Sequence, residues 1–150
     1  MVLIAIPRIL VGIDGSKSSN DAANYAISIA RRFGSQVTLL HVVPPFSKIG
    51  HSSGISGLVP PRFFTQAKEE AEMWFVEIRK RAVELQKPVL SKIISTASSP
   101  GLEIAKFGER EKVDLIVVGT KGKTGLKRAL LGSTAGDVVK YSSSPVLVVK

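Results

Sequence analysis

Residues 114–122 read DLIVVGTKG, and this stretch decides the fold that the sequence predicts. Residues 114–118 are the most strand-like run in the chain, with the near-continuous hydrophobicity of a parallel strand that is buried on both faces. The run stops at Gly119, where a segment rich in glycine, hydroxyl groups and lysine begins. Such a strand end indicates an α/β sheet, in which ligands bind beyond the carboxyl ends of the strands.

Outward from this stretch, apolar runs alternate with segments of helical periodicity. With residues 114–118, the predicted strands are 8–13, 37–43, 89–95 and 145–149. The predicted helices cover about 18–33, 63–86, 98–107 and 133–141, and Ser18 with Asp21 resembles a capping box at the start of the first. Strands joined through helices need crossover connections, so the sequence predicts an open, parallel five-stranded α/β sheet with helices on both faces.

The chain has 150 residues, the usual size of one domain, and no linker separates two cores. We therefore expect a single domain over residues 1–150. Prolines, glycines and serines crowd residues 44–62, which predicts a mobile surface loop. Residues 1–6 are apolar but lack the basic leader and the cleavage site of a signal peptide.

Composition narrows the classes of protein and partner. The chain has no cysteine, which excludes disulfides and thiolate sites, and no apolar run approaches the ~20 residues of a membrane span. These features favour a cytoplasmic protein without a membrane partner. The formal net charge of +9 favours anionic partners, and Lys121, Lys123, Lys127 and Arg128 form its densest cluster.

The segment after residue 118 has two features suited to phosphate. Glycines from Gly119 to Gly125 allow backbone N–H groups to approach an anion closely. Gly132, Ser133 and Thr134 open the next predicted helix, whose free N–H groups and dipole favour a second anion contact. The spacing does not match a Walker P-loop, and Gly12 to Gly15 does not match the Rossmann fingerprint. The residues alone therefore predict a phosphate site divided between a strand end and a helix N-terminus.

The spacing Gly119-x2-Gly122-x9-Gly132-Ser133 resembles the ATP-binding motif of the universal stress protein family. Residues 8–16 look like the family's first strand and acidic turn, and residues 39–43 look like its second strand. The runs 114–122 and 145–149 look like its fourth and fifth strands. The combined resemblance covers nearly the whole chain.

The resemblance implies the strand order 3-2-1-4-5 and a binding crevice between Asp14 and Gly119. It also implies bound ATP, or ADP or AMP, with Mg²⁺ or Mn²⁺ held by the phosphates, and a homodimer formed through residues 145–149. By position, the resemblance assigns adenosine binding to Gly12, Asp14 and Val42. Val118 and Gly119 would line the nucleotide. The residues that would meet the phosphates are Gly122, Gly132, Ser133 and Thr134. Many ATP-binding members have proline where Gly12 stands, so the packing of adenine is expected to differ here.

The family's role implies a nucleotide-responsive module in the stress response, with slow ATP hydrolysis or none. No catalytic residue and no metal-ligand set is evident in the sequence. His41, on a predicted strand, is interpreted as structural, and His51 falls in the predicted loop. A weak ATPase, with Asp14 as base, and an AMP or ADP sensor remain alternatives. So do a nucleotide-free module that only dimerises and a basic protein that binds nucleic acid through residues such as Arg31 and Arg79.

Overall fold

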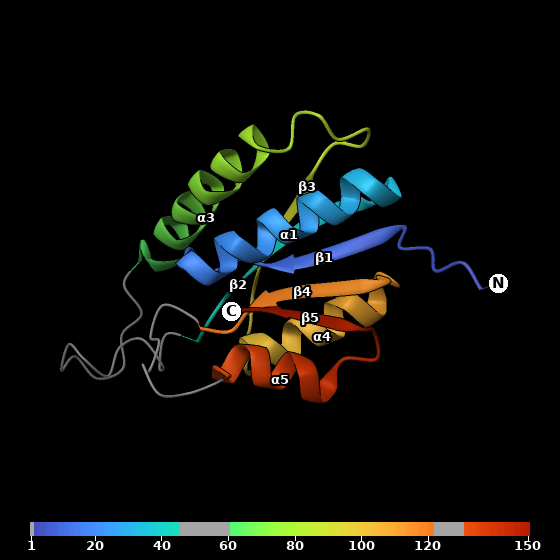
Figure 1. Ribbon diagram of the computed structural model, residues 1–150. Helices are drawn as coiled ribbons and strands as arrows, with labels where there is room; N and C mark the ends of the chain where they lie inside the picture. The colour runs from blue at the N-terminus through green and yellow to red at the C-terminus, as the bar shows by residue number, and fades with distance from the viewer. Residues whose placement is uncertain (1, 46–60, 122–130) are drawn as a thin grey trace.

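The structure is a computed structural model that describes residues 2–45, 61–121 and 131–150. Strands β1 (Arg8–Gly12), β2 (Gln36–Val43), β3 (Leu90–Ser95), β4 (Leu115–Gly119) and β5 (Val146–Val149) alternate with helices α1 (Lys17–Phe33), α3 (Phe63–Lys80), α4 (Pro100–Arg110) and α5 (Ser133–Tyr141). All strand pairs are parallel, and the sheet order is β3-β2-β1-β4-β5 (Figure 1). The predicted fold class and strand order are confirmed.

The sheet separates two hydrophobic clusters because neighbouring residues of a strand point to opposite faces. Ile9 and Val11 of β1 are fully buried beneath α1 and α3, where Phe75 of α3 is the largest fully buried side chain. Leu10 of β1 is buried on the other face, in a cluster that includes Ile104 of α4. The helices therefore form one layer on each side of the sheet, as Figure 1 shows.

The binding edge follows from the strand order. β1 pairs with β2 on one side and with β4 on the other, so Val11 lies opposite both Leu39 and Val117. After β1 the chain continues into α1 on one face, whereas after β4 it continues toward α5 on the other face. Connections that diverge in this way leave a crevice between the two strand ends.

The start of α1 differs from the prediction. The helix begins at Lys17, and its N-cap is Ser16, whose Oγ accepts a hydrogen bond from the N–H of Ser19 at 3.2 Å. The capping box expected from Ser18 and Asp21 was wrong, because Ser18 lies inside the first turn. Asp21 instead forms an ion pair with Lys17 at 2.9 Å. The Ser18 hydroxyl is thereby available for another contact.

The end of α3 also differs, since the helix stops at Lys80 and not near residue 86. The N–H groups of Arg81 and Ala82 donate to carbonyls three residues earlier, both at 3.0 Å, which is the 3₁₀ pattern of a tightened last turn. Ala82 remains buried, so the apolar periodicity continued where the helical hydrogen bonds did not. Most of the predicted loop 44–62 lies outside the described residues.

Candidate functional site

A cavity of about 1100 Å³ opens at the carboxyl ends of the central strands. Its wall combines residues from the ends of β1, β2 and β4 with residues from α3, α4 and α5. The sequence-predicted residues on this wall are Gly12, Asp14, Val42, Val118, Gly119, Gly132, Ser133 and Thr134. Gly122 lies outside the described residues. The structure thus brings the described members of the predicted set to one cavity, and their contact with a ligand stays a prediction.

The turn between β1 and α1 holds the carboxylate of Asp14 in a fixed place. Its Oδ1 accepts a hydrogen bond from the N–H of Ser16 at 2.9 Å, and its own N–H donates to Ser19 Oγ at 3.3 Å. Gly15 has a φ of 79°, and a Cβ there would lie 2.5 Å from the ring of Trp74. Within the described chain Asp14 Oδ2 accepts no hydrogen bond, so this oxygen is available to a ligand.

The two halves of the predicted phosphate segment are joined directly. The N–H of Thr120 donates to the carbonyl of Val149 at 2.8 Å, which extends the sheet by one residue beyond β4. The carbonyl of Thr120 in turn accepts from the N–H of Gly132 at 2.6 Å. The amide of Gly132 is therefore used inside the protein, and this bond sets the start of α5 beside the end of β4.

The N-terminus of α5 faces the cavity without a cap. Its N-cap is Gly132, in an extended conformation, and no side chain accepts from the first turn. In the parts of the chain that the structure describes, the N–H groups of Ser133, Thr134 and Ala135 have no acceptor, and all three residues line the cavity. By contrast, α4 begins with the cap Ser99, whose Oγ accepts from Leu102 at 3.1 Å.

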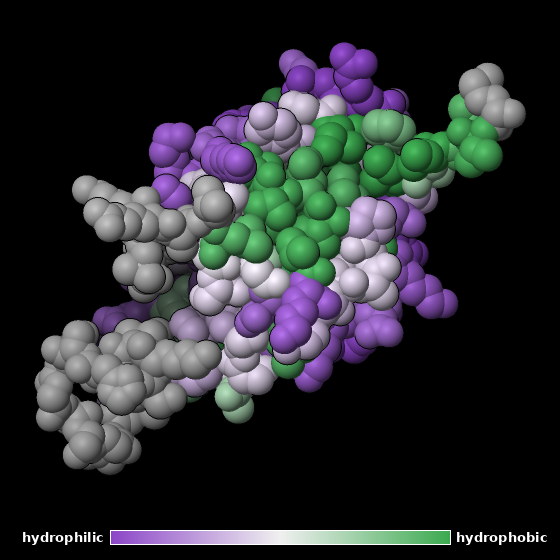
Figure 2. All heavy atoms as spheres, turned by 60° about the horizontal axis from the view of Figure 1, so that its bottom comes forward, coloured by the Kyte–Doolittle hydropathy of each residue, from purple (hydrophilic) through white to green (hydrophobic). Residues whose placement is uncertain are grey.

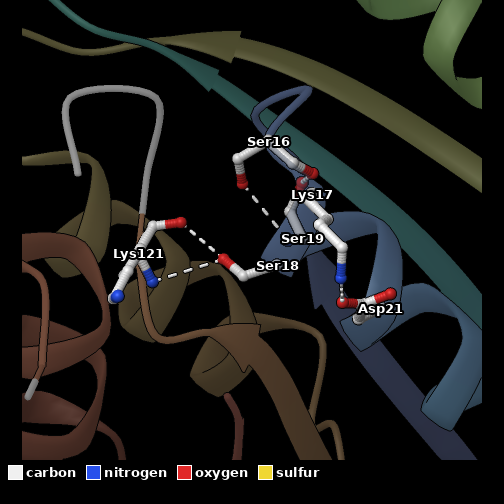
Figure 3. Close-up of polar contacts among 6 residues, drawn as sticks. All are labelled: Ser16, Lys17, Ser18, Ser19, Asp21 and Lys121. Atoms are coloured by element: carbon white, nitrogen blue, oxygen red, sulfur yellow. Dashed lines mark hydrogen bonds and ion pairs between the residues drawn. The ribbon is translucent and has the colours of Figure 1, made fainter. Parts of the chain in front are cut away.

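The structure requires glycine at position 119 for a reason other than the close approach of a phosphate that the sequence suggested. A Cβ at this position would lie 2.5 Å from the backbone carbonyl carbon of Ser18, so glycine permits α1 to pack closely on the end of β4. Two residues later, Ser18 Oγ donates to the carbonyl of Lys121 at 2.5 Å (Figure 3). Lys121 itself is exposed and lines the cavity.

The wall formed by α3 was not predicted, whereas the contribution of β2 through Val42 was. Phe63, Gln66, Ala67, Glu70 and Trp74 of α3 line the cavity at spacings of three, one, three and four residues, which is one helical face. Some of these residues belong to the apolar stripe of the predicted helix, so periodicity alone could not separate cavity wall from core. His41 Nδ1–H donates to the carbonyl of Ile13 at 2.7 Å, and its ring meets Trp74 edge-on with centroids 5.1 Å apart. His41 also lines the cavity, so its interpretation as a structural residue stays a prediction.

The described cavity wall carries charges of both signs. Asp14 and Glu70 are acidic, whereas Lys121 is basic. Among the described residues, no group of three or more histidine, cysteine, aspartate or glutamate side chains could hold a metal ion. A search of the described helices likewise finds none with the length and hydrophobicity needed to cross a membrane.

The comparison with known proteins gives a consistent family. The family model that matches residues 5–150 is that of the universal stress protein family. The universal stress protein MJ0531 of Methanocaldococcus jannaschii is 38% identical over 144 residues, which cover 95% of this chain and 81% of that protein. The solved structure of MJ0577, from the same organism, has a TM-score of 0.80 at 31% identity, with 98% of this chain and 97% of that chain covered.

Two other solved structures share the fold at lower identity. A universal stress protein in complex with cAMP has a TM-score of 0.66 at 22% identity, with coverage of 98% for both chains. One from Archaeoglobus fulgidus, in complex with dAMP, has a TM-score of 0.67 at 21% identity and covers 99% of this chain and 100% of that chain. Because the family model spans residues 5–150 and the relative MJ0531 is 38% identical, this chain belongs to the universal stress protein family.

Proposed function

We propose that this chain binds an adenine nucleotide, with ATP as the favoured ligand, and acts as a nucleotide-responsive regulatory module in the stress response. The observation that carries the proposal is the pairing of two features in one cavity. Asp14, with its carboxylate, and the residues of the uncapped N-terminus of α5 both line this cavity. The first suits the donors of adenosine, and the second suits phosphate.

The adenosine half would form around the end of β1. Asp14 Oδ2 would accept a hydrogen bond from a ribose hydroxyl or from the adenine amine. Val42 and Val118 would offer apolar surface to the base, and both are buried at the cavity wall. Gly12 lies between them on β1, where a Cβ would come within 3.3 Å of Val118, so its small size keeps this wall open.

The phosphate half would form between Gly119 and α5, with Gly122 contributing from outside the described residues. The free N–H groups of Ser133 and Thr134 would donate to phosphate oxygens, and the helix dipole would add to the attraction. Lys121 lines the cavity, and its ammonium group would compensate phosphate charge. Any Mg²⁺ or Mn²⁺ would be held through the phosphates, since the described residues supply no ligand set of their own.

The size of the cavity and the family neighbours support this ligand class. A volume of about 1100 Å³ is slightly above the usual range of small-molecule sites, so the cavity is large enough for a nucleotide. Two structures with the same fold hold cAMP and dAMP, which are adenine nucleotides. The hydrogen bonds of the hydroxyls on the described wall are to backbone groups and pair no nucleophile with a side-chain base, so we expect binding with slow hydrolysis or none.

Calorimetric titration with ATP, AMP and adenosine tests the proposal. The wild type should bind ATP, and Asp14→Ala should weaken ATP and adenosine alike by about tenfold, the effect of one charged hydrogen bond. Asp21→Ala is the matched control, because Asp21 is also an α1-end acid but does not line the cavity. A wild type that binds neither ATP nor AMP would contradict the proposed function.

We also propose that the protein forms a homodimer through β5. This strand pairs only with β4 among the described strands, so one side of it is an open sheet edge. Figure 2 shows a broad hydrophobic area in the middle of the molecule that continues into the N-terminal segment, where Val2, Leu3 and Ile4 are 92%, 84% and 75% exposed. Such an area is typical of a protein interaction surface.

A single substitution tests the edge. The carbonyls of Pro145 and Val149 accept from β4, so the alternation of a strand directs the N–H of Val148 away from β4. Val148→Pro would therefore remove an outward donor while the β4 ladder stays paired. Sedimentation should give a dimer for the wild type and a monomer for Val148→Pro, and an unchanged dimer would contradict pairing through this edge.

A further inference from the structure

We propose that Ser18 is a positioning residue for the phosphate half of the site, an inference that rests on the proposed nucleotide binding. Ser18 lies in the first turn of α1, 103 residues away from Lys121 in the sequence. Its Oγ donates to the carbonyl of Lys121 at 2.5 Å and accepts from the N–H of Lys121 at 3.3 Å. We call these two hydrogen bonds the Ser18 tether (Figure 3).

Ser18 lies in a helix turn that is held by further contacts. The first turn of α1 is held by the Ser16 cap, and the backbone of Ser18 packs against the end of β4 at Gly119. The same turn carries Asp14 through its hydrogen bond to Ser16. The end of α1 therefore fixes both the carboxylate of the adenosine half and the backbone where the phosphate half begins.

Lys121 is the last described residue before residue 131, and it follows the sheet residue Thr120 directly. The N–H and carbonyl of Thr120 are bonded to Val149 and Gly132, so they belong to the sheet and the α5 junction. At Lys121, in the described chain, both backbone groups are bonded to Ser18 alone. The tether thus fixes the backbone of Lys121, a residue that lines the cavity.

A backbone that is ordered before the ligand arrives lowers the conformational entropy lost on binding. The benefit applies only to ligands that reach the phosphate half. The tether should therefore strengthen the binding of ATP and have little effect on adenosine. A residue that merely stabilised the fold would change both affinities together.

Calorimetric titration of Ser18 variants separates these cases. Ser18→Ala should weaken ATP by about tenfold and change adenosine by no more than about twofold. Ser18→Thr, which keeps a hydroxyl, should bind ATP like the wild type. Ser28→Ala makes the same chemical change at an exposed position of α1 and should have no effect.

Amide hydrogen exchange in the absence of nucleotide gives a second readout. Because the N–H of Lys121 donates to Ser18, it should exchange faster in Ser18→Ala and at the wild-type rate in Ser18→Thr. The inference is overturned if Ser18→Ala binds ATP as the wild type does, if it weakens ATP and adenosine equally, or if threonine does not restore binding. A wild type without any affinity for adenine nucleotides would instead contradict the proposed function itself.

Discussion

The N-termini of α1 and α5 both lie at the cavity, and they differ in how they are capped. The start of α1 is closed by its own sequence, because Ser16 caps Ser19 and the carboxylate of Asp14 accepts from Ser16. The start of α5 has glycine at the N-cap, no side-chain cap and no acid in its first turn. Both ends carry the partial positive charge of a helix dipole. Only the first has its negative partner within the described protein.

This difference assigns the two halves of the proposed ligand. A phosphate at α5 would supply the acceptors that Ser16 and Asp14 supply at α1. Asp14, with one oxygen already bonded to Ser16, presents an acceptor and a negative charge, which suits ribose or adenine donors and disfavours phosphate. The contrast between the closed and the open helix end is therefore the physical basis for the orientation of the nucleotide.

The largest expected effect is a loss of stability when alanine replaces the glycine at the end of a central strand. At Gly119 an added Cβ meets the backbone of Ser18 at 2.5 Å, so Gly119→Ala must displace α1 from β4. At Gly12 it meets side-chain atoms of Ile104 and Val118 at 3.0 and 3.3 Å, which can shift. Urea unfolding should show a loss of about 3 kcal/mol for Gly119→Ala and about 1 kcal/mol for Gly12→Ala.

Equal losses at the two glycines would contradict the close packing of α1 on β4. The comparison is well matched, because both residues end central strands and both line the same cavity. The free energies should be compared at identical denaturant slopes, which indicate that the unfolded states are alike.

The open end of α5 can be converted toward the closed type. Gly132→Asp places a carboxylate at the N-cap, whose extended backbone is suited to a capping side chain. The ligand-free protein should gain about 0.5 kcal/mol in its free energy of unfolding. ATP should bind about tenfold more weakly, because the carboxylate occupies the N–H groups of the helix end and repels the phosphates. Gly132→Asn provides the uncharged control. Unchanged ATP affinity in Gly132→Asp would show that phosphate does not use this helix end.

The closed end of α1 should respond in the opposite way. Ser16→Ala removes the cap of α1 and should lower the free energy of unfolding by about 1 kcal/mol. Ser99→Ala removes the equivalent cap of α4 and should lower the free energy of unfolding by a similar amount. Ser99 is not among the residues that line the cavity. Neither substitution should change the ratio of ATP to adenosine affinity. A selective loss of ATP affinity in Ser16→Ala would indicate that phosphate binds at the start of α1, which would contradict its assignment to α5.

Much of this arrangement could be predicted from the sequence. The apolar runs predict the strands well because burial on both faces leaves a continuous signal, and Gly119 with Gly132 marks the two ends that the fold brings together. The reason for Gly119 could not be predicted, since the approach of Ser18 depends on how α1 crosses β4. For the same reason the sequence placed Ser18 as a cap, although the true cap, Ser16, lies two residues earlier. The wall formed by α3 was hidden because one helical face includes both core and cavity residues.

The central claim is that phosphate binds at the open end of α5, and Ser133→Pro tests it most directly. Ser133 is the first residue of α5, where proline is tolerated, and Gly132 already has the extended conformation that precedes a proline. The substitution removes one free N–H, whereas Ser133→Ala keeps it and removes only the hydroxyl. Titration should show ATP weakened by about tenfold in Ser133→Pro relative to Ser133→Ala, with adenosine unchanged. Equal ATP affinity in the two variants, or an equal loss of adenosine, would contradict the account.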